Sequence, residues 1–387
     1  MSDRLLATLI GLVLAASAVS AHGQAAPAIS AETKAATGEL SEAQRAEVDG
    51  FLRSCVQRMG AGHATAAEHR QAIAAVRNEI VAAYGNDHGA GYKRYFATSC
   101  AANFAPAALD GNDPLVQVNA ALVVSRLRQP ELAPVAERMI AHANPAVRYH
   151  GAKTYTGIRD ALLSTSPEAR ERMMAGLTGL ADREKSPIVL AAAYEALDLS
   201  AATAVPSVMG AVRPRARGAV MSSLRRNLPA VRAGDARMSE AVARGARVAA
   251  AMSADMPRPE RTELLQTLAE LMKNAGATYV DLFGGVAAAR DRQKDAIEMT
   301  ILAYSQMLGE LERVTGQITG FAETPVATAL AVKPVDPARV LLAVNEWVGT
   351  PGEGGQAGKL AGDGVKPPTV LPGAAGPTPA TAPANET

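Results

Sequence analysis

The amino-acid sequence predicts an all-α fold in which helix–turn–helix units stack side by side as an α-solenoid. The first observation behind this prediction is a helix start that occurs three times, at Asp113-Pro114, Asn144-Pro145 and Ser186-Pro187. In each pair, an oxygen-bearing side chain can accept a hydrogen bond from an unpaired N–H of the first helical turn. The proline then occupies a position where no backbone N–H is needed.

The second observation is a row of small and aliphatic residues at fixed distances from these prolines. The second, sixth, ninth and thirteenth positions after each proline are separated by steps of four, three and four, which places them on one helix face. A small residue at the sixth position lets a neighbouring backbone come close. The row therefore predicts the inner helix of each repeat. Its members are Val116, Ala120, Val123 and Leu127, then Val147, Gly151, Thr154 and Ile158, then Val189, Ala193, Ala196 and Ser200.

Composition supports helices that pack closely on other helices. The chain has 387 residues, of which 48% are hydrophobic but only 4% aromatic, so its core is built from Ala, Val, Leu and Met. The alternating patterns typical of strands are nearly absent. The formal net charge is +1, so whole-chain electrostatics favour no particular class of partner.

The repeated segments resemble a known family of helical repeats. They read DPLVQVNAALVVSRL, NPAVRYHGAKTYTGI and SPIVLAAAYEAL, and they are similar to the second helices of HEAT-type repeats over about a quarter of the chain. The prolines are 31 and 42 residues apart, and the arginine that often follows the valine in this family occurs once, as Arg148. The resemblance implies a HEAT-like array over residues 111–230, with a fourth, poorly matched copy from Pro214 to Leu228. The outer helices are expected at Glu131 to Ala141 and from Ser166-Pro167 onward.

The beginning of the chain has the pattern of a secretory signal peptide. Arg4 supplies positive charge, Leu5 to Ala16 form a short apolar run, and Val19-Ser20-Ala21 offers a cleavage site after Ala21. The apolar run is shorter than the ~20 residues that a membrane span needs. The sequence therefore predicts a signal peptide over residues 1–21 of bacterial type, a periplasmic or extracellular protein without an integral membrane span, and a flexible linker over residues 22–40.

Two further helical regions flank the repeats. Residues 41–110 predict an N-terminal helical cap, which opens with the capping box of Ser41 and Gln44 and shields the first repeat. Residues 231–348 predict a C-terminal helical region, in which a long helix from Val286 to Val314 packs as a hairpin on a helix from Glu260 to Asn274. In residues 349–387, sixteen of 39 residues are Gly or Pro, which predicts a disordered tail.

The two cysteines, Cys55 and Cys100, are predicted to form a disulfide, because export leads to an oxidising compartment. Two buried free thiols are the alternative.

Catalytic signatures are absent from the sequence. It contains no GxSxG elbow, no GxGxxG after a strand, no GxxxxGK[ST] loop and no HExxH or CxxC pattern. His63, His69 and His88 lie within 26 residues, but a spacing of six does not place His63 and His69 on one helix face. We interpret them as solvated surface histidines, so neither a metal nor another cofactor is expected.

One stretch of the chain is unevenly charged. Nine arginines stand between residues 213 and 247, opposed by Asp235 and Glu240, which gives a local excess of +7. Arginine suits bidentate binding of carboxylate or phosphate, so the stretch is a candidate site for an acidic peptide, a phosphorylated polymer or anionic envelope material. The favoured alternative is that the arginines pair with acidic residues elsewhere in the array. The candidate binding residues are Arg213, Arg215, Arg217, Arg225 and Arg226.

These patterns lead to a hypothesis about function. The repeats and the lack of catalytic motifs predict an exported helical-repeat scaffold that binds a protein or peptide partner and has no enzymatic activity. Anion binding in the cell envelope by the arginine-rich stretch is the alternative, and a metal-dependent enzyme using the histidines is a remote one. Nucleic acid is not an expected partner, because the arginine-rich stretch lacks interleaved aromatic residues.

Overall fold

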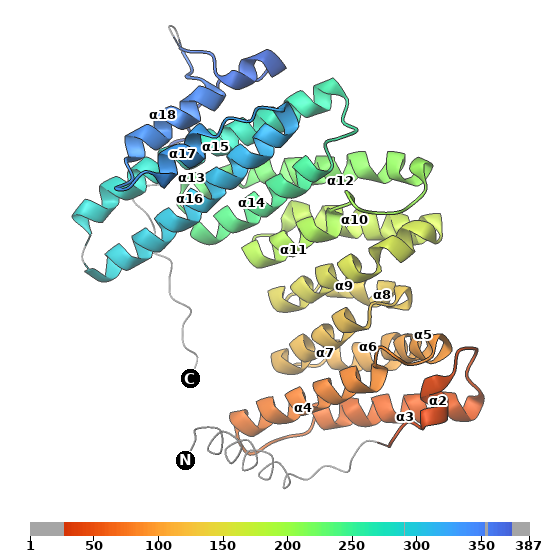
Figure 1. Cartoon of the computed structure of the whole chain (residues 1–387). Coiled ribbons are helices and arrows are strands. Elements are labelled where there is room, and N and C mark those ends of the chain that lie inside the picture. Colours follow the sequence, from red (N-terminus) through yellow and green to blue (C-terminus); the bar gives the residue numbers. More distant parts are fainter. Residues whose placement is uncertain (1–26, 290, 353–354, 374–387) are drawn as a thin grey trace, which may run out of the picture. The chain divides into compact units, whose positions relative to one another are not determined.

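The computed structural model describes residues 27–289, 291–352 and 355–373 (Figure 1). All regular secondary structure within these ranges is helical, which confirms the predicted all-α class. The chain divides into two compact units, Met1–Val123 and Val124–Thr387. The predicted signal peptide and the last residues of the tail, from 374 on, lie outside the described residues.

The first unit is built around one long amphipathic helix. This helix, α3, packs against α4, α5 and the turn that follows α5, and it buries Val48, Phe51, Leu52 and Cys55. The predicted capping box is confirmed, because Ser41 Oγ accepts from the Gln44 N–H and Gln44 Oε1 accepts from the Ser41 N–H. The helices of this unit are α2 (Ala31–Ala35), α3 (Glu42–Met59), α4 (Ala66–Tyr84), α5 (Ala90–Ser99), a π-helical turn (Cys100–Phe104), α6 (Ala105–Leu109) and the first part of α7 (Pro114–Leu127).

The linker predicted over residues 22–40 is partly ordered, which corrects that prediction. Ser30 caps the short helix α2, and the Thr33 side chain is fully buried. Glu47 of α3 accepts hydrogen bonds from the Ser30 N–H (3.0 Å) and from the Thr33 hydroxyl (2.9 Å). A carboxylate from the next helix thus fixes a segment whose composition alone indicated flexibility.

The second unit consists of helices that pack in two rows. One row runs through α9, α11, α14 and α16, and the other through α8, α10, α12 and α15, with each helix packed against the next in its row. One hydrophobic core includes buried residues of both rows and of the C-terminal segment, from Ala136 to Val365. The helices are α8 (Ala133–Ile140), α9 (Pro145–Ser164), α10 (Pro167–Arg183), α11 (Pro187–Leu197), α12 (Pro206–Arg226), α13 (Leu228–Arg232), α14 (Ala236–Ala251), α15 (Arg258–Ala288), α16 (Asp291–Thr319), α17 (Pro325–Ala331) and α18 (Pro337–Val348).

The predicted inward row is buried at every position but one. Ser200 is exposed because α11 ends at Leu197, before the row is complete. At Gly151, an added Cβ atom would lie 2.9 Å from the backbone nitrogen of Ile140 and 2.9 Å from the Cβ of Met139. The small residue therefore does allow α8 to approach α9 closely, as the sequence predicts.

Most of the predicted helix starts are confirmed. Asp113, Asn144, Ser166 and Asp336 each accept a hydrogen bond from a backbone N–H of the turn that follows. Ser186 does not, so its predicted capping role is wrong. Two further boundaries also differ from the prediction, because α12 begins at Pro206 with Pro214 inside it and α15 continues to Ala288.

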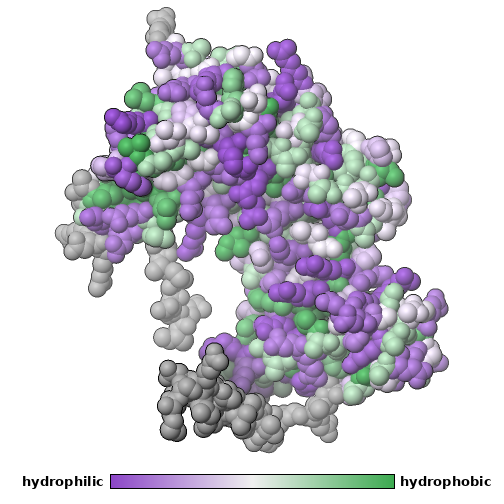
Figure 2. All heavy atoms as spheres, in the orientation of Figure 1, coloured by the Kyte–Doolittle hydropathy of each residue, from purple (hydrophilic) through white to green (hydrophobic). Residues whose placement is uncertain are grey.

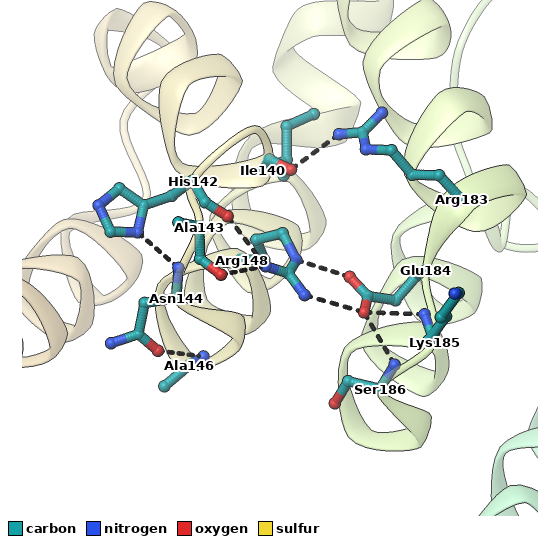
Figure 3. A network of polar contacts seen from close by, with 10 residues as sticks. All are labelled: Ile140, His142, Ala143, Asn144, Ala146, Arg148, Arg183, Glu184, Lys185 and Ser186. Carbon is teal, nitrogen blue, oxygen red and sulfur yellow. Dashed lines mark hydrogen bonds and ion pairs between the residues drawn. The ribbon is translucent and has the colours of Figure 1, made fainter.

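Glu184 instead binds the backbone just before α11 (Figure 3). Its Oε1 accepts from the N–H groups of Lys185 (3.0 Å) and Ser186 (2.8 Å). The same carboxylate receives both arms of Arg148, at 2.7 Å from Nε and 3.0 Å from Nη2, and Arg148 also donates to the carbonyls of His142 and Ala143. This buried network joins the turn before α9 to the turn before α11.

Candidate functional site

The five candidate arginines all lie on α12, and each is paired with a carboxylate. These partners come from the neighbouring helices α10 and α15 or from the segments adjoining them. Only Arg217 is buried, with 3% of its side chain exposed, and it bridges two acids. The pairs are Arg213 with Asp255, Arg215 with Glu171, Arg217 with Asp255 and Glu260, Arg225 with Glu263, and Arg226 with Asp182.

This pairing connects helices within a row. It also neutralises most of the positive charge with which the arginines would bind an anion. A cavity of about 250 Å³ lies between α12 and α15, but its charged lining residues are two of these arginines and their own partners, Glu260 and Glu263. The sequence signal was therefore a real cluster of arginines whose charge is compensated by acids from 38 to 44 residues away. The arrangement favours the alternative in which the arginines pair within the array.

Cys55 and Cys100 are both free and buried, so the predicted disulfide is not present in the structure. Cys55 lies on α3 and Cys100 begins the π-helical turn that packs on it. Burial raises the pKa of each thiol to about 12. Both are inert apolar core residues at neutral pH, which corresponds to the alternative left open by the sequence.

The histidines form no metal centre among the described residues. His69 Nε2 lies 2.5 Å from Asp113 Oδ2, and the rings of His63 and His69 are 5.3 Å apart. His88 instead packs its ring edge against Tyr92. On α16, Glu310 and Glu312 have separate partners, since Glu310 binds Arg247 and Arg313 while Glu312 accepts from Trp347.

The candidate site lies instead on α15, where the C-terminal segment of the chain is bound. Residues 359–371, here called the strap, begin with a 3₁₀ turn (Lys359–Asp363) and continue without regular secondary structure (Figure 1). The tail predicted to be disordered from Gly349 is therefore ordered over this part, which corrects the prediction. Apolar side chains hold it, because Leu360 is fully buried and Val365 is only 5% exposed.

Polar side chains of α15 bind the backbone of the strap in register. The Thr262 hydroxyl donates to the carbonyl of Asp363 (2.9 Å). One turn on, Gln266 binds Lys366 twice, because its Oε1 accepts from the Lys366 N–H (2.9 Å) and its Nε2 donates to the Lys366 carbonyl (3.3 Å). The strap therefore runs in the same direction as α15, and Gln266 pairs with it much as a neighbouring strand does.

The far end of the strap is held at Leu371 from two helices. The Leu371 N–H donates to Asn274 Oδ1 on α15 (2.8 Å), and its carbonyl accepts from Arg232 Nε on α13 (2.9 Å). Arg232 is itself fixed by Asp281, at 2.6 Å from its Nη1. Both backbone groups of Leu371 are thus satisfied by side chains that other contacts hold in place.

The entrance to the strap is anchored beside α18. Lys359 forms an ion pair with Glu323, and its ammonium lies 5.5 Å from the centre of the Trp347 ring. Just before it, Lys273 of α15 donates to Asn345 and to the carbonyl of Gly349, at the end of α18. Burial lowers the pKa of Lys273. These contacts lock the point where the chain leaves α18 and turns onto α15.

The polar groups at this site hold the backbone of the strap by hydrogen bonds. Hydroxyl, amide and guanidinium groups reach backbone N–H and C=O groups, while apolar side chains fill the surface between them. The polar contacts bind the backbone of an extended chain, because every residue except proline offers the same N–H and C=O groups, whereas the apolar contacts depend on its side chains. Sequence reasoning missed the site because it weighed only the Gly and Pro content of the tail. The signal it left aside was the set of apolar residues Leu360, Val365 and Leu371 around Pro367-Pro368.

No helix among the described residues combines the length and the apolar character that crossing a bilayer requires. Comparison with protein-family models, with curated proteins and with solved structures finds no match for this chain.

Proposed function

We propose that this protein is a non-catalytic helical scaffold that binds an extended segment of a partner protein along α15. The observation that carries the proposal is the strap, whose backbone is bound by Thr262, Gln266, Asn274 and Arg232. A surface that holds one extended chain by its backbone can hold another of similar shape. The chain's own tail then acts as a resident competitor for the partner.

The scaffold itself is proposed to be a HEAT-like array of stacked repeats. Ion pairs between successive helices of each row support this proposal. Lys153 of α9 pairs with Glu195 of α11, and on α12 Arg215 pairs with Glu171 of α10 and Arg217 with Glu260 of α15. Export by the predicted signal peptide would place the scaffold, and its partner, in the periplasm or outside the cell.

Competition by the tail follows from its attachment to the same chain. A tethered segment has an effective concentration on the order of millimolar at its site, far above that of a free partner. The apparent affinity for the partner equals the intrinsic affinity multiplied by the fraction of molecules whose site is vacant. The full chain is therefore expected to bind weakly until its strap is weakened or displaced.

Binding of the chain's own strap sequence as a free peptide tests the proposal. The probe is a fluorescently labelled synthetic peptide of residues 358–373, and its anisotropy is measured with three forms of the full chain. In the weakened-strap variant, Val365→Asp with Leu371→Asp, we expect at least about tenfold tighter apparent binding than in the wild type, because the intramolecular competitor is lost. The control variant, Thr369→Asp with Val370→Asp, adds the same charge at exposed positions and should behave as the wild type.

The binding surface is tested in the same series. Adding Gln266→Ala and Asn274→Ala to the weakened-strap variant should abolish binding of the probe. Circular dichroism establishes that each variant is folded, and Val365→Ala alone, with a severalfold gain expected, serves if the double variant does not fold. A folded weakened-strap variant that binds the probe no better than the control variant contradicts the proposal.

A further inference from the structure

Burial along the second half of the strap recurs every three residues. Val365 and Pro368 are buried and Leu371 is half-buried, whereas Lys366, Thr369, Val370 and Pro372 are exposed. Pro367 lies between these extremes. A period of three is that of a polyproline II helix, in contrast to the period of two in a β-strand.

The hydrogen bonds of the strap fit the same conformation. A polyproline II helix has no internal hydrogen bonds, so its backbone groups must be satisfied from outside. Lys366 and Leu371 each use both their N–H and their carbonyl in bonds to side chains of α15 or α13. Between them, Pro367 and Pro368 have no N–H to satisfy, and the Thr369 N–H has no protein partner within the described ranges.

We infer that the surface of α15 is specific for a left-handed polyproline II segment with the pattern Val-x-x-Pro-x-x-Leu, supplied by a partner protein. This inference rests on the proposed function and names its ligand class. The three marked residues of such a segment lie on one edge and face α15, and the residues between them face solvent. Gln266 and Asn274 then fix the register. Gln266 binds the backbone of the residue that follows the marked valine, and Asn274 binds the backbone N–H of the marked leucine.

A preference for polyproline II segments has an energetic reason. A segment that already populates the polyproline II conformation loses little conformational freedom on binding, so a modest set of contacts gives useful affinity. Proline also fixes its φ angle near the value that this helix requires. A partner with a proline-rich linker is therefore favoured over one with a flexible glycine-rich segment.

The register of the pattern is tested with peptides of unchanged composition. The weakened-strap variant, Val365→Asp with Leu371→Asp, is titrated with the 358–373 peptide and with the same peptide in which Pro368 and Thr369 are exchanged. We expect the exchange to weaken binding by at least about tenfold, because it moves the proline from the buried edge to the exposed one. Peptides with Thr369→Ala or Val370→Ala should bind within about twofold of the parent.

A peptide that is expected to bind more tightly provides a second test of the inference. Thr369→Pro in the peptide should tighten binding by about two- to fivefold, since position 369 is exposed, its N–H is not used and proline rigidifies the free peptide. If the parent peptide binds but neither the exchange nor Thr369→Pro changes its affinity, the polyproline II inference is overturned and the peptide-binding function stands. If the parent peptide itself does not bind, both fall together.

Discussion

Replacing Arg148 by alanine is expected to destabilise the second unit by about 3–5 kcal/mol, as is typical when one partner of a buried ion pair is removed. Glu184 has only 3% of its side chain exposed, and without Arg148 its carboxylate keeps only the N–H groups of Lys185 and Ser186. The carbonyls of His142 and Ala143 lose their donor in the same step. Unfolding in urea, followed by circular dichroism, measures the change.

The effect of this substitution is also expected to depend on pH. Burial raises the pKa of Glu184, but the hydrogen bonds from Arg148 and the backbone outweigh it, so the pKa lies below its ordinary value. A carboxylate whose pKa is lowered by folding stabilises the protein above its unfolded pKa of about 4.3, and this contribution is lost as the pH falls through the folded pKa. The difference in stability between wild type and Arg148→Ala should therefore shrink below about pH 4.

The matched control is Arg215→Ala. Arg215 also forms an ion pair, with Glu171, but their side chains are 41% and 61% exposed, so its loss should cost less than about 1 kcal/mol. Equal losses of stability in the two variants would contradict the role assigned to the buried network.

The second large effect is expected at Glu312, which is 1% exposed on α16. Its carboxylate accepts from the indole N–H of Trp347 (2.8 Å) and from the N–H groups of Val326 and Ala327 (2.7 Å each). Glu312→Ala leaves these donors without an acceptor and should cost about 3–5 kcal/mol, at about 1–3 kcal/mol for each buried unsatisfied group. Glu312→Gln retains one side-chain oxygen, so its free energy of unfolding should lie between those of the wild type and Glu312→Ala.

The chain's single tryptophan makes this prediction easy to follow. Trp347 is fully buried, so its fluorescence reports on the junction of α16, α17 and α18. In Glu312→Ala we expect a shifted emission maximum in the native state and an earlier unfolding midpoint. Glu298→Ala, on an exposed part of the same helix, should stay within about 0.5 kcal/mol of the wild type. An unchanged midpoint in Glu312→Ala would show that the three hydrogen bonds are unimportant.

Local features of the fold could be predicted from the sequence. Helix starts depend on a residue and its next few neighbours, and those at Asp113, Asn144, Ser166 and Asp336 are confirmed. The inward row is also a local feature, because each set of four positions is defined by spacing within one predicted helix. Ser186 makes no capping bond, and the backbone before α11 is bound instead by Glu184, which pairs with Arg148 from 36 residues away.

Features that depend on distant residues could not be predicted. The order of the strap depends on Asn274 and Arg232, which lie 97 and 139 residues before Leu371. The same is true of the charged helix α12, whose arginines are compensated by acids on other helices. Figure 2 shows hydrophilic and hydrophobic residues interspersed on the face in view. Composition describes a segment in isolation, whereas order and charge balance are decided by what packs against it.

Hydrogen–deuterium exchange of the strap tests the central claim most directly. In the full-length wild-type chain, the amides of Lys366 and Leu371 are expected to exchange much more slowly than in the free 358–373 peptide, because they donate to Gln266 and Asn274. In Gln266→Ala with Asn274→Ala, they should approach the rate of the free peptide while α15 remains protected. Exchange of these amides at the free-peptide rate in the wild type would contradict the account, because the surface of α15 would then have no resident segment to serve as its model ligand.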